Sequence, residues 1–413
     1  MDNLTHSLIG AIVAETAVRF VPVLKSTLPA TTRRTLYFSL LVLGSNFPDL
    51  DLLYTGFGGA KLDYLLHHRG HTHTLIGAVL ISAFMFLCAT GWLRWRGIAS
   101  TVADRRWLGV LALLAPLLHI GMDATNSYGV HPFWPLDNRW FYGDSIFIIE
   151  PLFWAAAAPL VFLLQSPLAR GAIVFVLLLA VGLAFGSGLV LPELAACLLL
   201  LMAGLLFAGW RASARFAAAS GLLATVAVVS MFLLTGRMAA SRISTQVSSQ
   251  FSRASLLDSV LTPSPVNPFC WDAIVVQLDA DTYTLRRGLL SLAPALLPAA
   301  ECPQPNATAQ TTAAFTPVMR ASNASLHWQG ELAMSRSEVQ SVIAGNCEAA
   351  ALAIFARALW ISREQDQWLI GDLRFDREPG PGFAELLLDT DAANCPTNIP
   401  PWSPPRTDVL VND

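Results

Sequence analysis

The chain has 413 residues, of which 54% are hydrophobic and 13% are charged, whereas about 25% of the residues in an ordinary soluble domain are charged. So few charges cannot cover a water-soluble surface. The formal net charge is -3, and the sequence has no run of lysine or arginine. It therefore predicts no basic surface that could bind nucleic acid. The composition therefore indicates a membrane protein with no nucleic-acid partner, and it leaves protein partners open.

Apolar segments dominate the first part of the chain, and a membrane helix needs about 20 mainly apolar residues. Two short segments come first, Leu4–Val21 and Leu36–Ser45, which are predicted to lie at the interface or to pack against other helices. Residues 1–236 therefore predict a mainly α fold, a polytopic membrane bundle of about seven to eight apolar helices. The longer segments, each predicted to cross the bilayer, are Thr74–Trp95, Trp107–Met122, Ile146–Gln165, Gly171–Leu191, Leu194–Trp210 and Phe216–Gly236.

The character of the chain changes after Gly236. Residues 237–268 are rich in serine and then in proline, which predicts a linker or neck. Residues 269–413 contain short alternating segments and two helix-like ones, which predict a small α+β soluble domain. Its cysteines form an even set, which suggests two disulfides and an oxidising compartment, with the pairing left open. They are Cys270, Cys302, Cys347 and Cys395.

Basic residues beside the apolar segments predict the orientation, because cytoplasmic loops carry an excess of lysine and arginine. If the connections that carry them are all cytoplasmic, residues 1–6, 46–73, 123–145, 192–193 and everything after about residue 237 face outward. This orientation agrees with the oxidising compartment that the cysteines suggest. The basic residues are Lys25, Arg33, Arg34, Arg94, Arg96, Arg105, Arg106, Arg170, Arg211 and Arg215.

Histidines and aspartates gather in the outward segments of the first third of the chain. Such groups are costly beside apolar helices unless they are paired or bound to metal. The richest segment, LLHHRGHTHTLIG, carries His67, His68, His71 and His73 together with Arg69. Imidazole nitrogens suit a borderline metal such as zinc, and the arginine suits an anionic substrate group. This segment is the most specific local signal in the chain.

Three further segments bring candidate ligands to the same side. Asp49 and Asp51 follow a short helix in GSNFPDLD, although such acids also serve as helix caps or solvated loop residues. His119 and Asp123 are four residues apart and share one helix face, as two ligands or as a hydrogen-bonded pair. His6 lies near the outer end of the first helix, where a lone histidine is often structural. Glu150 lies inside an apolar stretch, where it needs a partner.

Several of these motifs in this order resemble the YdjM-like family of inner-membrane metal-dependent hydrolases. The matching pieces cover about residues 1–155: MDNLTHSLIG, NFPDLD, the H-R-G-x-T-H core of HHRGHTH, HIGMD with TNSYG, and YGDSIFIIEPLFW. The resemblance implies a location in the bacterial inner membrane and does not cover the C-terminal domain. It implicates as metal-site residues His6, Asp49, Asp51, His68, His73, His119 and Asp123.

The sequence therefore predicts hydrolysis by water activated on one or two divalent ions, with zinc favoured by the mixed ligands. The predicted substrate is a phosphoester, such as a lipid headgroup or a lipid-linked phosphate at the membrane surface. Arg69 is expected to bind phosphate oxygens, and Asp51 or Glu150 to act as general base. The alternative is a metal-binding transporter, sensor or scaffold without hydrolytic activity.

Overall fold

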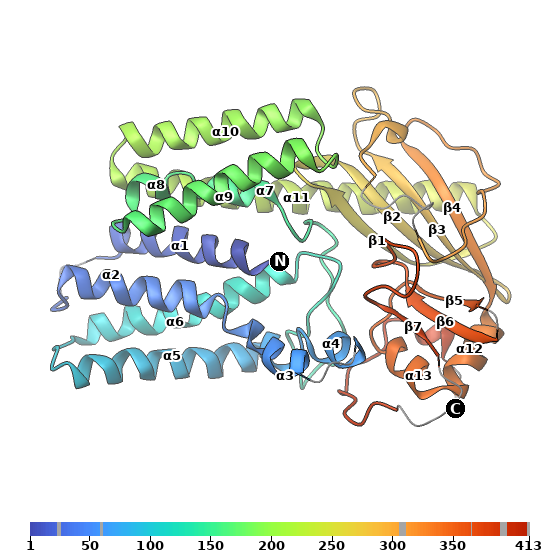
Figure 1. The fold of residues 1–413 in the computed structure, drawn as a ribbon, viewed down its shortest axis with the longest axis horizontal. Coiled ribbons are helices and arrows are strands. Elements are labelled where there is room, and N and C mark those ends of the chain that lie inside the picture. Colours follow the sequence, from blue (N-terminus) through green and yellow to red (C-terminus); the bar gives the residue numbers. More distant parts are fainter. Residues whose placement is uncertain (23–25, 58–60, 305–310, 365, 389–394, 411–413) are drawn as a thin grey trace.

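A computed structural model describes the chain except for residues 23–25, 58–60, 305–310, 365, 389–394 and 411–413. A bundle of helices forms one half of the molecule and two sheets with short helices form the other (Figure 1). The helices of the first half are α1 (Asn3–Phe20), α2 (Ala30–Phe38), η1 (Ser39–Leu43), η2 (Pro48–Asp51), α3 (Leu52–Phe57), α4 (Lys61–His67), η3 (His71–His73), α5 (Leu75–Trp95), α6 (Val102–Asp123), α7 (Pro151–Ala156), α8 (Leu160–Leu163), α9 (Pro167–Gly186), α10 (Pro192–Arg211) and α11 (Ala214–Gln250).

Five helices in the described part of the chain are long and apolar enough to cross a membrane, namely α5, α6, α9, α10 and α11. The structure does not confirm the predicted count of about seven to eight apolar spans. The predicted span Ile146–Gln165 is interrupted, because Pro151 begins α7 and Pro159 separates it from α8. A proline has no N–H to donate to the preceding turn, so it begins or breaks a helix.

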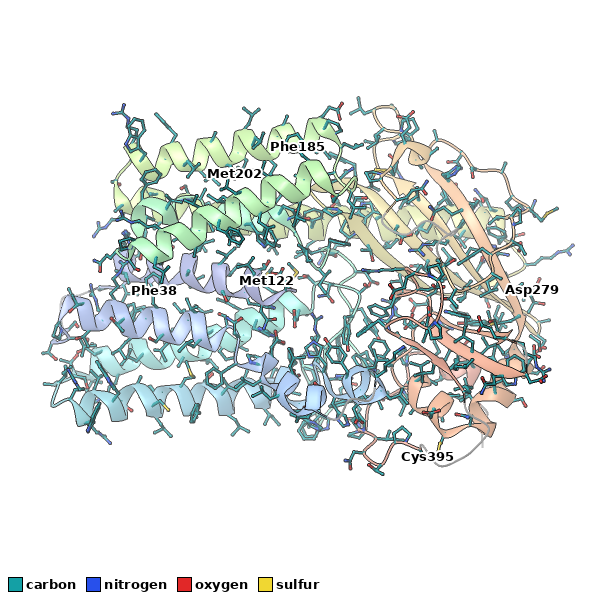
Figure 2. The ribbon with its side chains drawn as sticks, in the orientation of Figure 1. Phe38, Met122, Phe185, Met202, Asp279 and Cys395 are labelled. Atoms are coloured by element: carbon teal, nitrogen blue, oxygen red, sulfur yellow. A yellow bond between two sulfur atoms is a disulfide. The ribbon has the colours of Figure 1, made fainter. Side chains whose placement is uncertain are left out.

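The two short apolar segments pack inside the bundle. Ile9 and Ile12 of α1 are buried in the same cluster as α9, α10 and α11, and Leu40 and Leu41 of η1 are buried against α5 and α6. Figure 2 shows how side chains fill the space between the helices, and Met122 of α6 and Met202 of α10 belong to one buried cluster. These segments therefore support the ends of the longer helices.

The predicted neck at residues 237–268 is regular structure. Helix α11 continues to Gln250, and its 37 residues extend about 55 Å, well beyond a hydrocarbon core of about 30 Å. Beyond the apolar part, Ala239, Ile243 and Val247 are buried at a spacing of four residues. They share a buried cluster with residues of the first sheet. These apolar residues stand between serines in the sequence, and their packing against the first sheet keeps the segment helical.

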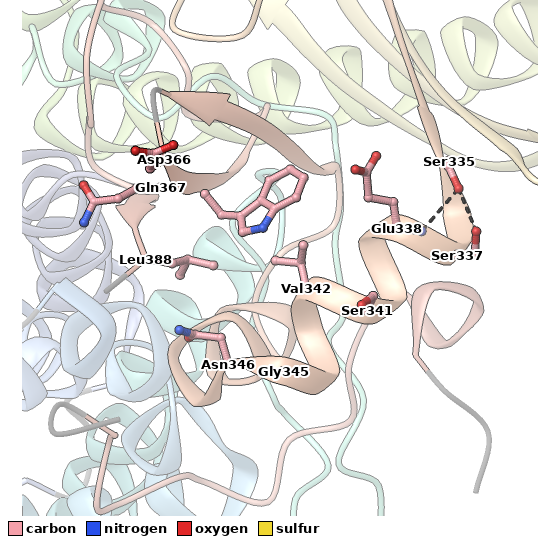
Figure 3. A pocket seen from close by; sticks show the side chains of 11 residues that line it. Ser335, Ser337, Glu338, Ser341, Val342, Gly345, Asn346, Asp366, Gln367 and Leu388 are labelled. Atoms are coloured by element: carbon pink, nitrogen blue, oxygen red, sulfur yellow. Dashed lines mark hydrogen bonds between the residues drawn. The ribbon is translucent and has the colours of Figure 1, made fainter. Parts of the chain in front are cut away.

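The C-terminal half consists of two antiparallel sheets with the strand orders β1-β2-β3-β4 and β5-β6-β7. Helices α12 and α13 lie in the chain between the sheets, and Cys270 pairs with Cys302 and Cys347 with Cys395. A cavity of about 720 Å³ lies between α12 and β6 (Figure 3). The elements are β1 (Ser255–Ser264), β2 (Asn267–Asp279), β3 (Thr282–Ser291), η4 (Ala299–Glu301), β4 (Leu326–Ser335), α12 (Arg336–Gly345), α13 (Cys347–Ala353), β5 (Leu359–Glu364), β6 (Gln367–Asp372), β7 (Glu385–Leu387) and η7 (Thr407–Val409).

The C-terminal half closes over one end of the bundle. Leu65 and Leu66 of α4 are buried in its core, and the indole of Trp402 donates to the carbonyl of Leu66. Trp402 also stacks on His131, at 3.8 Å between ring centroids. The covered end contains the start of α1, the η2 and η3 turns and the end of α6 (Figure 1). The predicted histidine and aspartate segments therefore lie beneath the C-terminal domain.

Candidate metal centre

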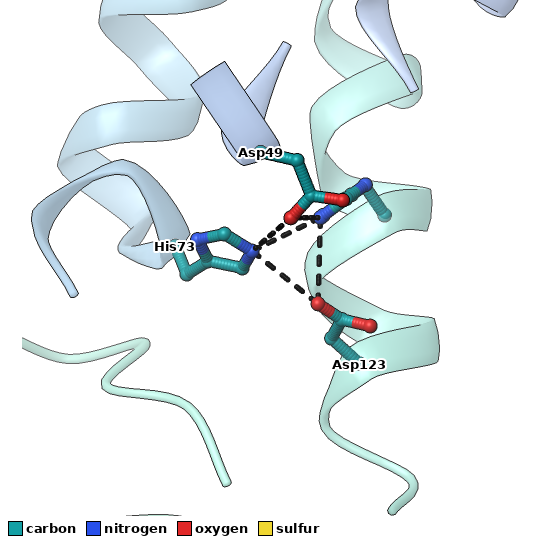
Figure 4. A group of neighbouring side chains, drawn as sticks. Asp49, His73 and Asp123 are labelled. Carbon is teal, nitrogen blue, oxygen red and sulfur yellow. Dashed lines mark hydrogen bonds and ion pairs between the residues drawn. The ribbon is translucent and has the colours of Figure 1, made fainter. Parts of the chain in front are cut away.

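Four buried side chains from three elements converge at the covered end of the bundle. Asp49 comes from η2, His73 from η3, and His119 and Asp123 from the last turns of α6. The i,i+4 spacing puts His119 and Asp123 on one face of α6. In Figure 4 the ring of His73 and the carboxylates of Asp49 and Asp123 point toward one another. We call these side chains the four-residue group.

The distances within the four-residue group match the edges of a coordination tetrahedron. Nε2 of His73 lies 3.0 Å from Nε2 of His119 and 3.3 Å from Oδ1 of Asp49. Oδ2 of Asp123 lies 3.3 Å from His73 Nε2 and 3.4 Å from His119 Nε2. Bonds of about 2.0–2.1 Å to a tetrahedral ion place the ligand atoms about 3.3 Å apart. The donor set and its spacing therefore fit a small divalent metal ion.

The two carboxylate oxygens that face the centre provide a second test. Oδ1 of Asp49 and Oδ2 of Asp123 are buried and accept no hydrogen bond within the described chain. Their charge is met at ion-pair distances of 3.1–3.4 Å by His73, His119 and, for Asp123, Arg69, and a bound cation satisfies both oxygens directly. The structure therefore fits a divalent ion at this point.

Neighbouring groups orient both histidines toward the centre. Nδ1 of His119 lies 2.7 Å from the carbonyl oxygen of Ser45. Nδ1 of His73 lies 3.0 Å from Oγ1 of Thr72 and 3.4 Å from Oδ2 of Asp51. An acceptor at one ring nitrogen holds its proton and leaves the other nitrogen free to bind metal. Both Nε2 atoms are thereby prepared as ligands.

Asp49 also belongs to a second buried group, with Asp51 and His68, whose ligand atoms lie within 4.8 Å of one another. We call it the three-residue group. Nδ1 of His68 lies 3.0 Å from Oδ1 of Asp51, whose Oδ2 accepts the backbone N–H of Arg69 at 2.9 Å. Arg69 has a φ of 60°, a conformation that non-glycine residues rarely adopt. Asp51 thus holds the strained turn that places His68 and Arg69.

Residues 1–191 match the profile of the YdjM inner membrane protein family. Both ligand groups lie within these residues, and the match confirms the resemblance that the motifs indicated. The chain is also 30% identical over 155 residues to the uncharacterized protein YfhP of Bacillus subtilis strain 168, a match that covers 37% of this chain and 42% of that protein. The chain thus spans less than half of that relative's length. No solved structure matches the chain.

In residues 1–191, which we call the YdjM region, hydrogen bonds determine the charges of the site. Burial by itself would raise the pKa of Asp51, but hydrogen bonds from His68 and His73 outweigh burial and hold it below its usual value. Burial would lower the pKa of His73, yet its contacts with Asp123, Asp49 and Asp51 raise it to about 10. Without a metal, His73 therefore carries a proton that balances the carboxylates, and a metal ion has to displace this proton.

Three predicted site residues of the YdjM region belong to neither ligand group. His6 and Arg69 are neighbours of these groups, and Glu150 contacts other parts of the chain. Nε2 of His6 lies 3.2 Å from Oδ1 of Asp123, which the terminal amine of Met1 also contacts, and the His6 ring stacks on that of His119. Nε of Arg69 lies 3.1 Å from Oδ2 of Asp123. These side chains therefore surround ligand residues without belonging to either group.

Glu150 lies outside both groups. Its Oε1 accepts the N–H of Leu152 at 3.1 Å, and both oxygens contact the N–H of Val266, at 3.2 and 3.1 Å. Backbone N–H groups therefore occupy its carboxylate, and the catalytic role predicted for it stays a prediction. Glu150 begins α7 and ties the bundle to the β1–β2 hairpin.

A cavity of about 360 Å³ adjoins the three-residue group. His68 and Arg69 form part of its wall, and Nη1 of Arg69 donates to Oδ1 of Asn126 at 2.9 Å. The opposite wall comes from the C-terminal domain, beyond the YdjM region, and includes Phe375 and Arg377. Sequence analysis missed these two residues and Asn126, because no spacing in the sequence links them to the histidine segment.

Proposed function

We propose that the chain is a membrane-bound, metal-dependent hydrolase that acts on a phosphoester at the outer face of the bacterial inner membrane. The observation that carries this proposal is that the three-residue group lies beside the cavity, with His68 in its wall. A catalytic metal site needs an open coordination position next to a cavity that can hold the substrate.

The two ligand groups favour different roles. Four side chains complete a tetrahedron by themselves, which is the arrangement of a structural zinc site. Three side chains leave a fourth position open, which is the arrangement of a catalytic one. Asp49 belongs to both groups, so two neighbouring ions fit the donors. We therefore assign the chemistry to the three-residue group and a supporting role to the four-residue group.

The reaction is the addition of water to phosphorus with cleavage of the P–O bond to the leaving alcohol, which takes up a proton. A bound divalent ion supplies a Lewis acid that activates the water and polarises the phosphoryl oxygens. Asp51 fixes the ring of His68 through Nδ1. Arg69, held by Asp123 and Asn126, presents its remaining guanidinium N–H groups beside the cavity to phosphate oxygens.

A phosphoester suits the charge of this centre. Three buried aspartates face the positions of two divalent ions and the guanidinium of Arg69, so the loaded centre has an excess of positive charge. Arginines at the uncovered end of the bundle support the proposed orientation, because Arg94 lies in the last turn of α5 and Arg105 lies near the start of α6. That end is then cytoplasmic, and the metal centre and the C-terminal domain face the periplasm.

The alternative is a metal-binding transporter, sensor or scaffold without hydrolytic activity. The completeness of the four-residue group favours a structural ion, and thus a scaffold. A transport path is less well supported. Acidic or basic side chains usually line an ion path through a membrane, but residues 75–93 and 108–118 contain none.

The proposal predicts that hydrolysis depends on metal and on His68. The purified chain in detergent should release product from dioctanoyl phosphatidic acid or bis(p-nitrophenyl) phosphate, lose this activity to a chelator and regain it with zinc. His68→Gln should lower turnover by at least about 100-fold and remove one ion while the four-residue group keeps its own. His327→Gln, a change of the histidine on β4, is the matched control and should change neither quantity. Turnover that survives both chelation and His68→Gln would refute the proposal.

A further inference from the structure

We propose that the loop between β6 and β7, residues 373–384, forms the substrate-selecting wall of the cavity beside the metal centre. In this inference, which rests on the proposed function, Arg377 binds the phosphate group of the substrate. Phe375 and Phe383 hold the apolar segment attached to it. The C-terminal domain thereby determines which phosphoester reaches the YdjM region.

The cavity is built from two parts of the chain that lie far apart in sequence. Tyr64 and Tyr128 line it from the bundle side, and Phe375 and Phe383 from the loop. The ring centroids of Tyr64 and Phe383 lie 5.4 Å apart, and those of Tyr128 and Phe375 lie 5.9 Å apart. This aromatic contact joins the two walls directly, so neither half forms the cavity alone.

Arg377 is available to a ligand. Its side chain reaches solvent, lines the cavity and forms no ion pair with any residue that the structure describes. The charges of Arg287 and Asp272 act on it from nearby with opposite signs.

Arg69, by contrast, is buried and already contacts Asp123 and Asn126. Glu378 is the acid among the described lining residues. Because Asp123 matches Arg69, the excess positive charge beside the cavity comes from Arg377 and from the loaded metal centre of the proposed function. The cavity beside the loaded centre therefore favours an anion, and Arg377 offers it a guanidinium without a described ion-pair partner, next to the remaining N–H groups of Arg69.

Hydrogen bonds hold the loop in place against the bundle. Nζ of Lys61 donates to the carbonyl oxygens of Pro381 and Gly382, at 3.0 and 2.7 Å. Nη1 of Arg374 donates to the carbonyl of Ser127 at 2.6 Å. At the other end of the loop, Oε2 of Glu385 accepts the N–H of Gly382 at 2.8 Å. A wall that is fixed before binding can discriminate between ligands.

The size and lining of the cavity define its occupant. A volume of about 360 Å³ is near the lower end of ligand cavities, about 300–1,000 Å³. It admits a phosphate group with a short apolar segment and excludes a folded protein. Ile146 and Ile148 line the cavity on the bundle side, and Ile148 and Ile149 are partly exposed next to it. The occupant is therefore a phosphate ester with an apolar chain, drawn from a lipid or from a soluble alkyl phosphate.

Binding of hexyl phosphate and of inorganic phosphate to the zinc-loaded full chain in detergent, measured by calorimetry, tests this inference separately from turnover. Arg377→Gln should weaken both ligands by about tenfold or more, the loss expected for one charge-assisted hydrogen bond, with unchanged zinc content. Phe383→Ser should weaken hexyl phosphate and leave inorganic phosphate unaffected. Arg363→Gln, a change of the arginine on β5 that stacks on Trp368, is the matched control and should affect neither.

The possible outcomes distinguish the binding role of the loop from the hydrolytic activity of the metal centre. Phosphate binding that depends on Arg377 in a chain without turnover supports the cavity assignment and refutes hydrolysis. Chelator-sensitive turnover together with unchanged affinities in both Arg377→Gln and Phe383→Ser overturns the inference and leaves hydrolysis standing. Vesicles of phosphatidylcholine with a tenth of phosphatidic acid separate the sources: turnover in vesicles identifies a lipid, and turnover of hexyl phosphate alone identifies a soluble ester.

Discussion

Exchanging Asp123 for asparagine is expected to weaken metal binding at the four-residue group by about 100-fold or more and, because Asp123 also holds Arg69, to lower hydrolysis. Even residues that only support a ligand contribute about 10–100-fold to metal affinity, and Asp123 is placed as a ligand itself. Its Oδ2 lies 3.3 Å from Nε2 of His73 and 3.4 Å from Nε2 of His119. Asparagine keeps the shape of the side chain but removes the charge that binds the cation.

Zinc content by mass spectrometry after dialysis against a weak chelator, together with turnover, measures this effect. Asp137→Asn is the matched control, because Asp137 lies in the segment that follows α6 and pairs with Arg139 at an exposed position. It should leave both quantities unchanged. Full zinc retention by folded Asp123→Asn would show that the four-residue group does not bind the ion.

Exchanging Arg357 for alanine is expected to lower the free energy of unfolding by about 3–5 kcal/mol, because it leaves two carboxylates without their partner at a largely buried site. Nε of Arg357 donates to Oδ2 of Asp258 at 2.6 Å, and Nη1 donates to Oδ1 of Asp144 at 2.9 Å. Asp144 lies in the segment that follows α6, and Asp258 lies on β1. The guanidinium therefore joins the segment after α6 to the first sheet, and the backbone N–H of Arg357 donates to Asp372 of the second sheet.

Chemical unfolding in detergent and limited proteolysis measure this second effect. We expect faster cleavage in the segment 124–150, since the C-terminal domain no longer holds it. Arg357→Lys should recover only part of the loss, because an ammonium group cannot form the same fork of hydrogen bonds. Arg139→Ala, at an exposed pair, should behave like the unchanged chain. An unaltered unfolding curve for Arg357→Ala would contradict the role given to this contact.

The ligand groups were largely predictable from the sequence. Imidazoles and carboxylates beside apolar helices need a compensating partner, and the i,i+4 spacing of His119 and Asp123 fixes their common face. The sequence could not divide the candidates into two groups. That division depends on backbone atoms, such as the carbonyl of Ser45 and the N–H of Arg69, which no residue type reveals.

The joining of bundle and C-terminal domain was not predictable. The serine-rich segment after Gly236 is typical of a linker, yet Ala239, Ile243 and Val247 keep it helical against the sheet. Arg377 lies more than 300 positions after His68 in the chain, and only the folded loop brings both to one cavity. Glu150 was expected near the metal, because a carboxylate in an apolar stretch needs a partner. The N–H of Val266 is that partner.

Anomalous diffraction above and below the zinc absorption edge, from crystals of the zinc-loaded chain, tests the metal centre most directly. We predict a peak between Nε2 of His73, Nε2 of His119, Oδ1 of Asp49 and Oδ2 of Asp123, at about 2.0–2.1 Å from each atom. A zinc-loaded crystal with no peak at this point, or with these side chains turned away from one another, would contradict the account.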